Sequence, residues 1–157
     1  IWVDLFILDK LPASRAGAEF TRFLHKAVYG MAMGHRYKLD FGKYSLIHKI
    51  FVGGLAAAGR LVPMKLIFAM QKAAALKDRH SKGSLRYYSN YQPDYLYVTV
   101  DKSCCDQVED SDFEDTRLMI PKGCHQILTE VYGNYMEMPP EDKRVPTHSS
   151  QQIRIFD

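Results

Sequence analysis

The first nine residues, Ile-Trp-Val-Asp-Leu-Phe-Ile-Leu-Asp, set the strongest constraint on what this chain can fold into. Residues 2–8 are apolar at every position except Asp4, and they show little alternation between apolar and polar side chains. A strand that is apolar on both faces is typical of a sheet covered on both sides. The segment therefore predicts a buried strand in a domain that combines a sheet with helices.

Asp4 is the charged residue inside this predicted strand, and it needs a partner there. A buried carboxylate without one costs on the order of several kcal/mol. It is either satisfied by backbone donors or an arginine, or it holds a metal ion or serves as a base. Asp9 follows at the exit of the strand, where a carboxylate in a solvated turn is the more common outcome.

Composition limits the class of protein. With 157 residues, 46% hydrophobic and 25% charged, the chain fits one globular domain. A net charge of +3, with scattered lysines and arginines, argues against a nucleic-acid binder. Three cysteines, two of them adjacent at Cys104 and Cys105, do not form a disulfide framework and favour a reducing, cytoplasmic setting. No signal peptide is visible.

Three helices are predicted in the first half of the chain. Ser14 is a good N-cap for the first helix. Apolar residues of this helix recur at helical spacing and should face the core; they are Phe20, Phe23, Leu24, Ala27 and Val28. Arg22 and His25 should point elsewhere. Two more helices are expected over residues 44–58 and 63–77 as a hairpin, with Pro63 at the start of the second.

Residues 50–70 are rich in apolar side chains, but Arg60, Pro63 and Lys65 interrupt them. A membrane span needs about 20 apolar residues in succession. A helix pair packed on the sheet or on itself is the favoured interpretation, and a hairpin resting on a membrane surface or an oligomer contact are the alternatives.

The second half predicts strands over residues 95–100 and 116–120, separated by an acidic loop at 101–115 that contains Asp110-Ser111-Asp112. A last helix should begin at Pro121 and end at Gly133 in a left-handed cap. Its apolar side would carry Ile127, Leu128, Val131 and Tyr132.

A zinc site is a further hypothesis for Cys104, Cys105, Cys124 and His125. Adjacent cysteines do not form the usual Cys-x-x-Cys knuckle, so four ligands would need a tertiary approach that the sequence does not show. Free thiols, buried or reactive, are the favoured interpretation.

Residues 132–144, Tyr-Gly-Asn-Tyr-Met-Glu-Met-Pro-Pro-Glu-Asp-Lys-Arg, resemble the C-terminal signature of the LicD family of phosphotransferases, and residues 1–9 resemble that family's Trp-x-Asp strand. Ile7 stands where the family pattern usually has proline. The Asp-Asp-x-Asp strand that such enzymes place upstream is not in this sequence, so we expect residues 1–157 to be the C-terminal portion of one LicD-like domain, inactive by itself.

The resemblance implies an α+β, nucleotidyltransferase-like fold with a small mixed sheet packed with helices. It also implies transfer of a phosphocholine-type group from a CDP-linked donor to a cell-surface glycan hydroxyl, for example on lipopolysaccharide or teichoic acid. The location would be cytoplasmic, with membrane-surface contact as an open alternative. The rival interpretation is a non-catalytic module for acceptor binding, oligomer contact or membrane attachment.

Site residues follow from the resemblance and from the chemistry of phosphoryl transfer, which needs carboxylates for Mg²⁺ (or Mn²⁺) and cations for phosphate. Asp4 is the expected catalytic and metal carboxylate, and Asp9 the weaker metal ligand. Arg144 and His148 are candidates for donor contact, because a guanidinium can hold phosphate through two hydrogen bonds. The aromatic and proline residues of the signature are expected to be structural.

Overall fold

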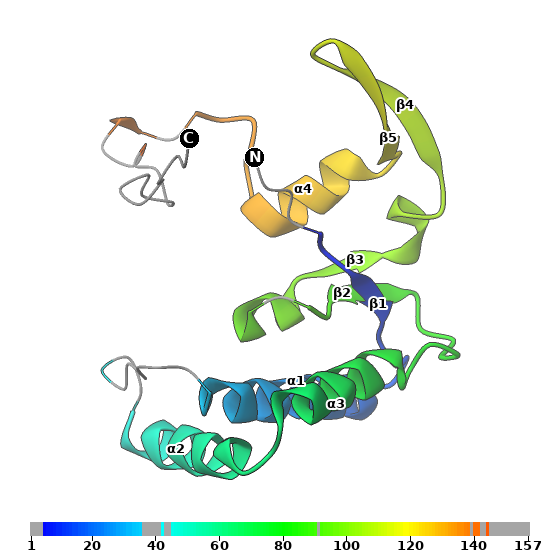
Figure 1. The fold of residues 1–157 in the computed structure, drawn as a ribbon. Helices are drawn as coiled ribbons and strands as arrows, with labels where there is room; N and C mark the ends of the chain where they lie inside the picture. The colour runs from blue at the N-terminus through cyan, green and yellow to red at the C-terminus, as the bar shows by residue number, and fades with distance from the viewer. Residues whose placement is uncertain are drawn as a thin grey trace, which may run out of the picture.

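The computed structural model describes residues 5–35, 42, 45–90, 92–138, 140–141 and 144. It is an α+β protein whose central sheet has three short strands: β1 (Leu8–Lys10), β2 (Leu85–Tyr88) and β3 (Thr99–Asp101). The order is β1-β2-β3, and both pairings are antiparallel. Within the described residues the expected mixed sheet is therefore wrong, since no parallel pair is present there. Figure 1 shows helices on both sides of this sheet.

The predicted strand over residues 2–8 is wrong at residues 5–7, and of its described residues only Leu8 is strand. Residues 5–7 are not strand, and Leu5 is 80% exposed. The Asn90 side chain takes the place of a neighbouring strand, because its Oδ1 accepts from Ile7 N at 2.8 Å and its Nδ2 donates to Leu5 O at 2.7 Å. β1 begins only at Leu8 and pairs with β2 alone, at the edge of the sheet.

The first helix, α1 (Arg15–Met33), confirms its prediction, and Ser14 caps it by accepting from Gly17 N. The buried face matches the expected one only in part. Val28 is buried as predicted, but Phe20 and Phe23 are exposed, and the other residues facing the core are Ala18, Thr21, His25 and Gly30. Small side chains on this face bring α1 close to its neighbours, and close packing leaves less room for phenylalanine.

Helices α2 (Leu46–Arg60) and α3 (Met64–Leu76) also form close to their predicted bounds, with Pro63 at the N-cap of α3, but they do not pack mainly on each other as the expected hairpin would. Both pack on α1, and α2 lies on the side of α1 away from the sheet (Figure 1). The approach of α2 is tight, because a Cβ added at Gly59 would collide with the backbone carbonyl of Met31. Among the described helices, none is long and apolar enough to cross a membrane.

The second half departs further from the sequence prediction. Residues 93–97 form a 3-10 helix, η1 (Pro93–Tyr97), so only the end of the expected strand is β3. A second short 3-10 helix, η2 (Lys102–Cys104), follows. The expected acidic loop is also partly wrong: Asp110 and Asp112 lie on β4 (Val108–Phe113), which pairs with the correctly predicted β5 (Thr116–Pro121) in a hairpin.

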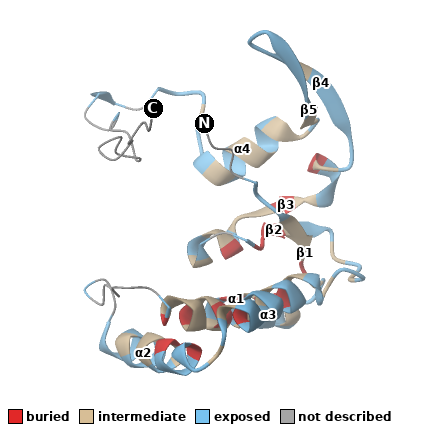
Figure 2. Ribbon diagram, viewed as in Figure 1, coloured by how far each residue is buried: buried red, intermediate tan, exposed pale blue. Residues whose placement is uncertain are grey.

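The last helix, α4 (Cys124–Tyr132), begins three residues later than predicted and ends at Gly133, whose φ of 69° lies in the region that glycine favours. It lies on the opposite side of the sheet from α1 and α3 (Figure 1). Figure 2 shows that buried residues concentrate on α1 and on β2 and η1 above it, while the β4–β5 hairpin is largely exposed. The core cluster is Leu11, Ala18, Tyr87 and Leu96.

Candidate functional site

An open cleft of about 360 Å³ lies between α3 and the β1–β2 edge of the sheet. Strand residue Asp9 and the two residues after β2, Ser89 and Asn90, form one wall. The other wall comes from one face of α3, because its residues recur every three or four positions; they are Phe68, Gln71, Lys72, Ala75 and Leu76. The cleft thus combines apolar surface with a carboxylate, an ammonium group, two amides and a hydroxyl.

Asp9 points to the side of the sheet that faces α1 and α3. It pairs with Tyr87 across the β1–β2 ladder, and directly paired residues share a face. The Ser89 hydroxyl donates to Asp9 Oδ2 at 2.6 Å. Ser89 is itself buried, and its backbone N–H donates to Ile7 O at 3.1 Å. The carboxylate is therefore half-buried and fixed in orientation at the cleft wall.

The α3 wall is tied to the same point. Gln71 Nε2 donates to Ser89 O at 3.3 Å, which links the middle of α3 to the end of β2. Phe68, Gln71 and Ser89 also line a second, smaller cavity of about 50 Å³ that reaches the buried His25. The two cavities therefore share a wall formed by α3 and the end of β2.

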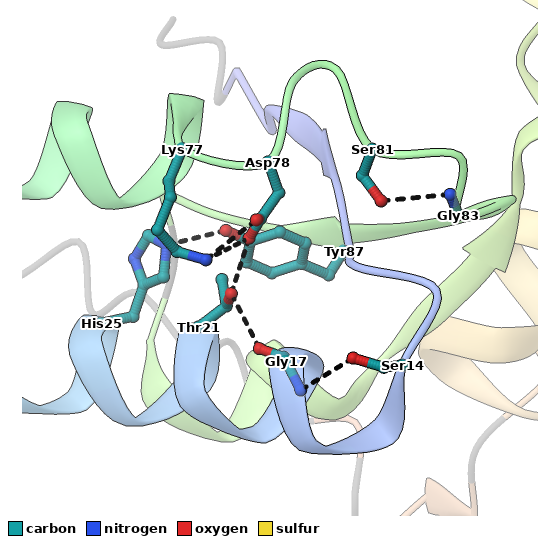
Figure 3. Close-up of polar contacts among 9 residues, drawn as sticks. All are labelled: Ser14, Gly17, Thr21, His25, Lys77, Asp78, Ser81, Gly83 and Tyr87. Atoms are coloured by element: carbon teal, nitrogen blue, oxygen red, sulfur yellow. Dashed lines mark hydrogen bonds and ion pairs between the residues drawn. The ribbon is translucent and has the colours of Figure 1, made fainter.

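Beneath the cleft, α1 and β2 share a buried polar network, drawn in Figure 3. His25 Nε2 lies 2.7 Å from Tyr87 Oη, and both side chains are buried. Nearby, the Thr21 hydroxyl donates to Asp78 Oδ2 at 2.6 Å, and Lys77 Nζ lies 2.8 Å from the same oxygen (Figure 3). The network joins the first helix to the sheet and to the end of α3.

Burial dominates the electrostatics of this network. Burial lowers the pKa of His25, although the negative charge of Asp9 opposes the shift. Burial raises the pKa of Tyr87 above its usual range, and Asp9 and Asp78 act in the same direction. Both groups are therefore neutral near pH 7, and their contact is a neutral hydrogen bond, with Asp9 as a nearby charge.

The arrangement can bind a ligand that carries hydroxyl groups. A carboxylate with one oxygen held by Ser89 presents its other oxygen to such a ligand, and Lys72 brings positive charge to the same cleft. A metal site is less complete. Across the described ranges no three His, Cys, Asp or Glu residues lie close enough together to hold a metal ion. Because Mg²⁺ prefers several oxygen ligands, these residues by themselves do not fit this ion.

The residues expected from the sequence are placed unequally. Asp9 lines the cleft, whereas Asp4 and His148 lie outside the described residues. Arg144 is exposed, its backbone N–H donates to Glu141 O at 3.2 Å, and it is not one of the residues that line the cleft. The structure therefore places Asp9 in one cleft with Ser89, Gln71 and Lys72, which were not predicted as site residues. Arg144 is not part of that cleft.

Sequence reasoning missed Ser89, Gln71 and Lys72, and it placed His25 away from the core. Strand β2 was not predicted, so nothing marked Ser89 as the residue that leaves a strand. The signal was present in Tyr87-Tyr88, because paired tyrosines have high strand propensity, and in the polar Ser89-Asn90 that follows.

The zinc hypothesis finds no support in the described residues. Cys104 is buried, and its thiol donates to Gln126 Oε1 at 3.2 Å. Burial, with the neighbouring Cys104, raises the pKa of Cys105, which keeps that thiol protonated. His125 Nδ1 lies 2.8 Å from Tyr135 Oη. All three cysteines are free thiols.

Comparison with known proteins supports a relationship to one enzyme. The chain is 33% identical over 61 residues to the lipopolysaccharide cholinephosphotransferase LicD of Haemophilus influenzae. That match is a partial one. It covers 39% of this chain and 22% of that protein. No protein-family model and no solved structure matches the chain. The resemblance to LicD that the signature residues suggested is thus supported over part of the sequence.

Proposed function

We propose that this chain belongs to a phosphotransferase that moves a phosphocholine-type group from a CDP-linked donor to a hydroxyl group of a cell-surface glycan. The observation that carries the proposal is the 33% identity over 61 residues to a protein that transfers phosphocholine to lipopolysaccharide. The cleft around Asp9 is compatible with this chemistry, because it has polar groups for a hydroxyl-bearing acceptor and a cation for a phosphate.

The proposed reaction has three linked changes. The acceptor oxygen attacks the phosphorus of the transferred group, the bond from that phosphorus to CMP breaks, and the hydroxyl proton is transferred to a carboxylate. Asp9 is the described carboxylate that lines the cleft, and Ser89 holds it in place. We assign to Asp9 the role of binding the acceptor hydroxyl and receiving its proton, a task that geometry allows within hydrogen-bond reach of a bound ligand. Asp4 and Mg²⁺ stay predictions from the family resemblance.

The test uses the full-length protein with CDP-choline, Mg²⁺ and a deacylated lipopolysaccharide acceptor, and it measures CMP release and acceptor labelling. Asp9→Asn retains an oxygen that can accept from Ser89 but loses the charge and the basicity. Removing a general base of this kind should lower turnover about 100-fold or more, with little change in melting temperature.

A matched control is Asp110→Asn, since Asp110 is an exposed strand carboxylate on β4, outside the cleft. It should retain the parental rate. Equal turnover by the Asp9→Asn variant would remove Asp9 from the mechanism. Absence of CMP release from the full-length protein, with donors of several head groups, would favour a non-catalytic module instead.

A further inference from the structure

The outward face of α2 is entirely apolar. Seven exposed residues lie in one sector about 140° wide, from the 100° turn per residue of a helix; they are Leu46, Ile47, Ile50, Phe51, Gly54, Ala57 and Ala58. No polar residue falls within that sector. Figure 2 shows the complementary arrangement, in which the buried residues of α2 lie toward α1 and the rest of the helix is intermediate or exposed. We call these seven residues the α2 apolar face.

Exposure of this face is too extensive to be incidental. Leu46, Ile47 and Ile50 are 74%, 79% and 71% exposed. Single exposed apolar side chains are normal on protein surfaces, but a contiguous apolar patch marks a surface that binds a partner or a membrane. We therefore expect the α2 apolar face to be a binding surface for a partner or a membrane.

Local charge indicates which occupant fits. Residues 36–77 contain eight lysines and arginines and a single acidic residue, Asp40, which is a net charge of +7, whereas the whole chain carries +3. The rest of the chain is therefore net negative. The segment that contains α2 and α3 therefore carries the excess of positive charge, because it is almost free of acidic residues.

Most of the described cations in this segment are not engaged in ion pairs. Within residues 45–77, Lys77 is the one cation with a carboxylate partner, Asp78. Lys65 and Lys72 are exposed on α3, and Lys49 is half-buried on α2, outside the apolar face and near the side that carries buried Ala56. Residues 41–77 contain no acidic side chain, so the positive charge of this segment is not compensated within it, although Lys72 shares the cleft with Asp9.

We propose that the α2 apolar face docks onto the surface of an anionic lipid bilayer, with the helix in the plane of the interface and the neighbouring lysines on the headgroups. A helix that has one apolar face and adjacent cations is typical of such binding. Anionic lipid accounts for both observations, because a nucleic acid would use the charge and leave the apolar face uncovered.

The docked orientation has a consequence for the cleft. Helix α3 follows α2 after residues 61–63, and it carries Phe68, Gln71 and Lys72 of the cleft wall. At 1.5 Å per residue, its 13 residues span about 20 Å. Docking through α2 therefore holds the cleft within roughly one short helix of the bilayer. The surface-binding proposal does not depend on the transfer reaction.

The test is flotation of the full-length protein with vesicles of phosphatidylcholine alone or mixed with phosphatidylglycerol, without donor or acceptor. Binding is expected to the mixed vesicles, and it should weaken with added salt. The double variant Ile47→Gln/Ile50→Gln should lose at least about tenfold in binding, because each buried isoleucine contributes more than that factor. Its melting temperature should match the parent, since both side chains are exposed in the folded protein.

A matched control is Leu118→Gln/Met119→Gln on β5, where Met119 is 76% exposed, close to the 79% of Ile47. It should float like the parent. In the charge series, Lys49→Gln and Lys65→Gln should each lower binding to the mixed vesicles about fivefold. Lys122→Gln, outside the basic segment, should have no effect.

Three results would overturn the proposal. The first is failure of the parent protein to float with the mixed vesicles, or equal flotation of the Ile47→Gln/Ile50→Gln variant and the Leu118→Gln/Met119→Gln control. The second is a dimer in vesicle-free buffer that the same variant converts to a monomer, which would assign the face to a second copy. The third is slow maleimide labelling of an Ile50→Cys variant without vesicles, which would show that another part of the full-length chain covers the face. CMP release with a deacylated acceptor is measured separately, so a failure of docking is distinct from a failure of the transfer function.

Discussion

Removal of the Tyr87 hydroxyl should destabilise the protein far more than the same chemical change at the surface. Tyr87 is 0% exposed, and its hydroxyl lies 2.7 Å from Nε2 of the buried His25. The variant Tyr87→Phe retains the ring and its packing but leaves the imidazole nitrogen without this partner. A buried polar group that loses its partner costs about 1–3 kcal/mol, because it has given up water without replacing it.

Tyr97→Phe is the matched control. Tyr97 is 50% exposed, and its hydroxyl lies 2.8 Å from Lys26 Nζ, so the same atom is deleted next to a group that water can solvate. The ring stays in place under the Arg22 guanidinium, 4.8 Å from its centroid. Surface changes of this kind usually alter the free energy of unfolding by about 0.5 kcal/mol or less.

The assay is equilibrium unfolding in urea, followed by circular dichroism. With a slope of about 1–3 kcal/mol per molar urea, a loss of about 2 kcal/mol moves the midpoint down by about 1 M for Tyr87→Phe. The double variant His25→Leu/Tyr87→Phe tests the cause. It removes both polar partners, so its cost should be lower than the sum of the two single costs by about 0.5–3 kcal/mol.

Two results would refute this reasoning. If Tyr87→Phe costs no more than Tyr97→Phe, the buried hydrogen bond is not contributing to stability. If the costs of the two single variants simply add in the double variant, His25 and Tyr87 are not coupled, and the destabilisation comes from packing alone.

The other predictions concern pH, glycine packing and donor binding. Burial lowers the folded-state pKa of His25 below its ordinary value of 6.5, so the unfolded chain binds the proton more readily. The free energy of unfolding should therefore fall as pH drops below about 6.5. In urea titrations at several pH values, His25→Leu should flatten that dependence on pH. Gly59→Ala should lower the melting temperature at a cost of about 1–3 kcal/mol, because the added Cβ meets the Met31 carbonyl. Gly53→Ala, with open space around it in the same helix, should raise the free energy of unfolding by about 0.5–1 kcal/mol. Equal effects of the two variants would contradict the close packing of α2 on α1 at Gly59. The family resemblance, and not the Asp9 cleft, is the basis for expecting donor contact at Arg144. In the full-length protein, Arg144→Lys should weaken donor affinity by about 1–3 kcal/mol in calorimetric titration with an unchanged melting temperature, since Arg144 is exposed. A sharp drop in melting temperature with unchanged affinity would assign it a structural role.

The sequence alone determined the elements whose signals are local. Ser14 caps α1 as predicted, and α2 and α3 lie close to their expected positions on either side of Pro63. Gly133 ends α4 with a positive φ, as expected for a glycine at that place. N-cap side chains, proline and glycine act on the backbone within one or two turns, so neighbouring residues are sufficient to predict them.

Only the tertiary structure decided which sides of these elements are buried and what surrounds Asp9. The phenylalanines of α1 predicted the face of the helix that packs on the core, but the helix buries Thr21 and His25 instead, because the sheet and the end of α3 approach that side. The carboxylate of Asp9 is held by Ser89, 80 positions away, and His25 contacts Tyr87 at a separation of 62. Such contacts depend on strand register and helix packing, which are set jointly by distant segments, so no local pattern around residue 9 could specify them.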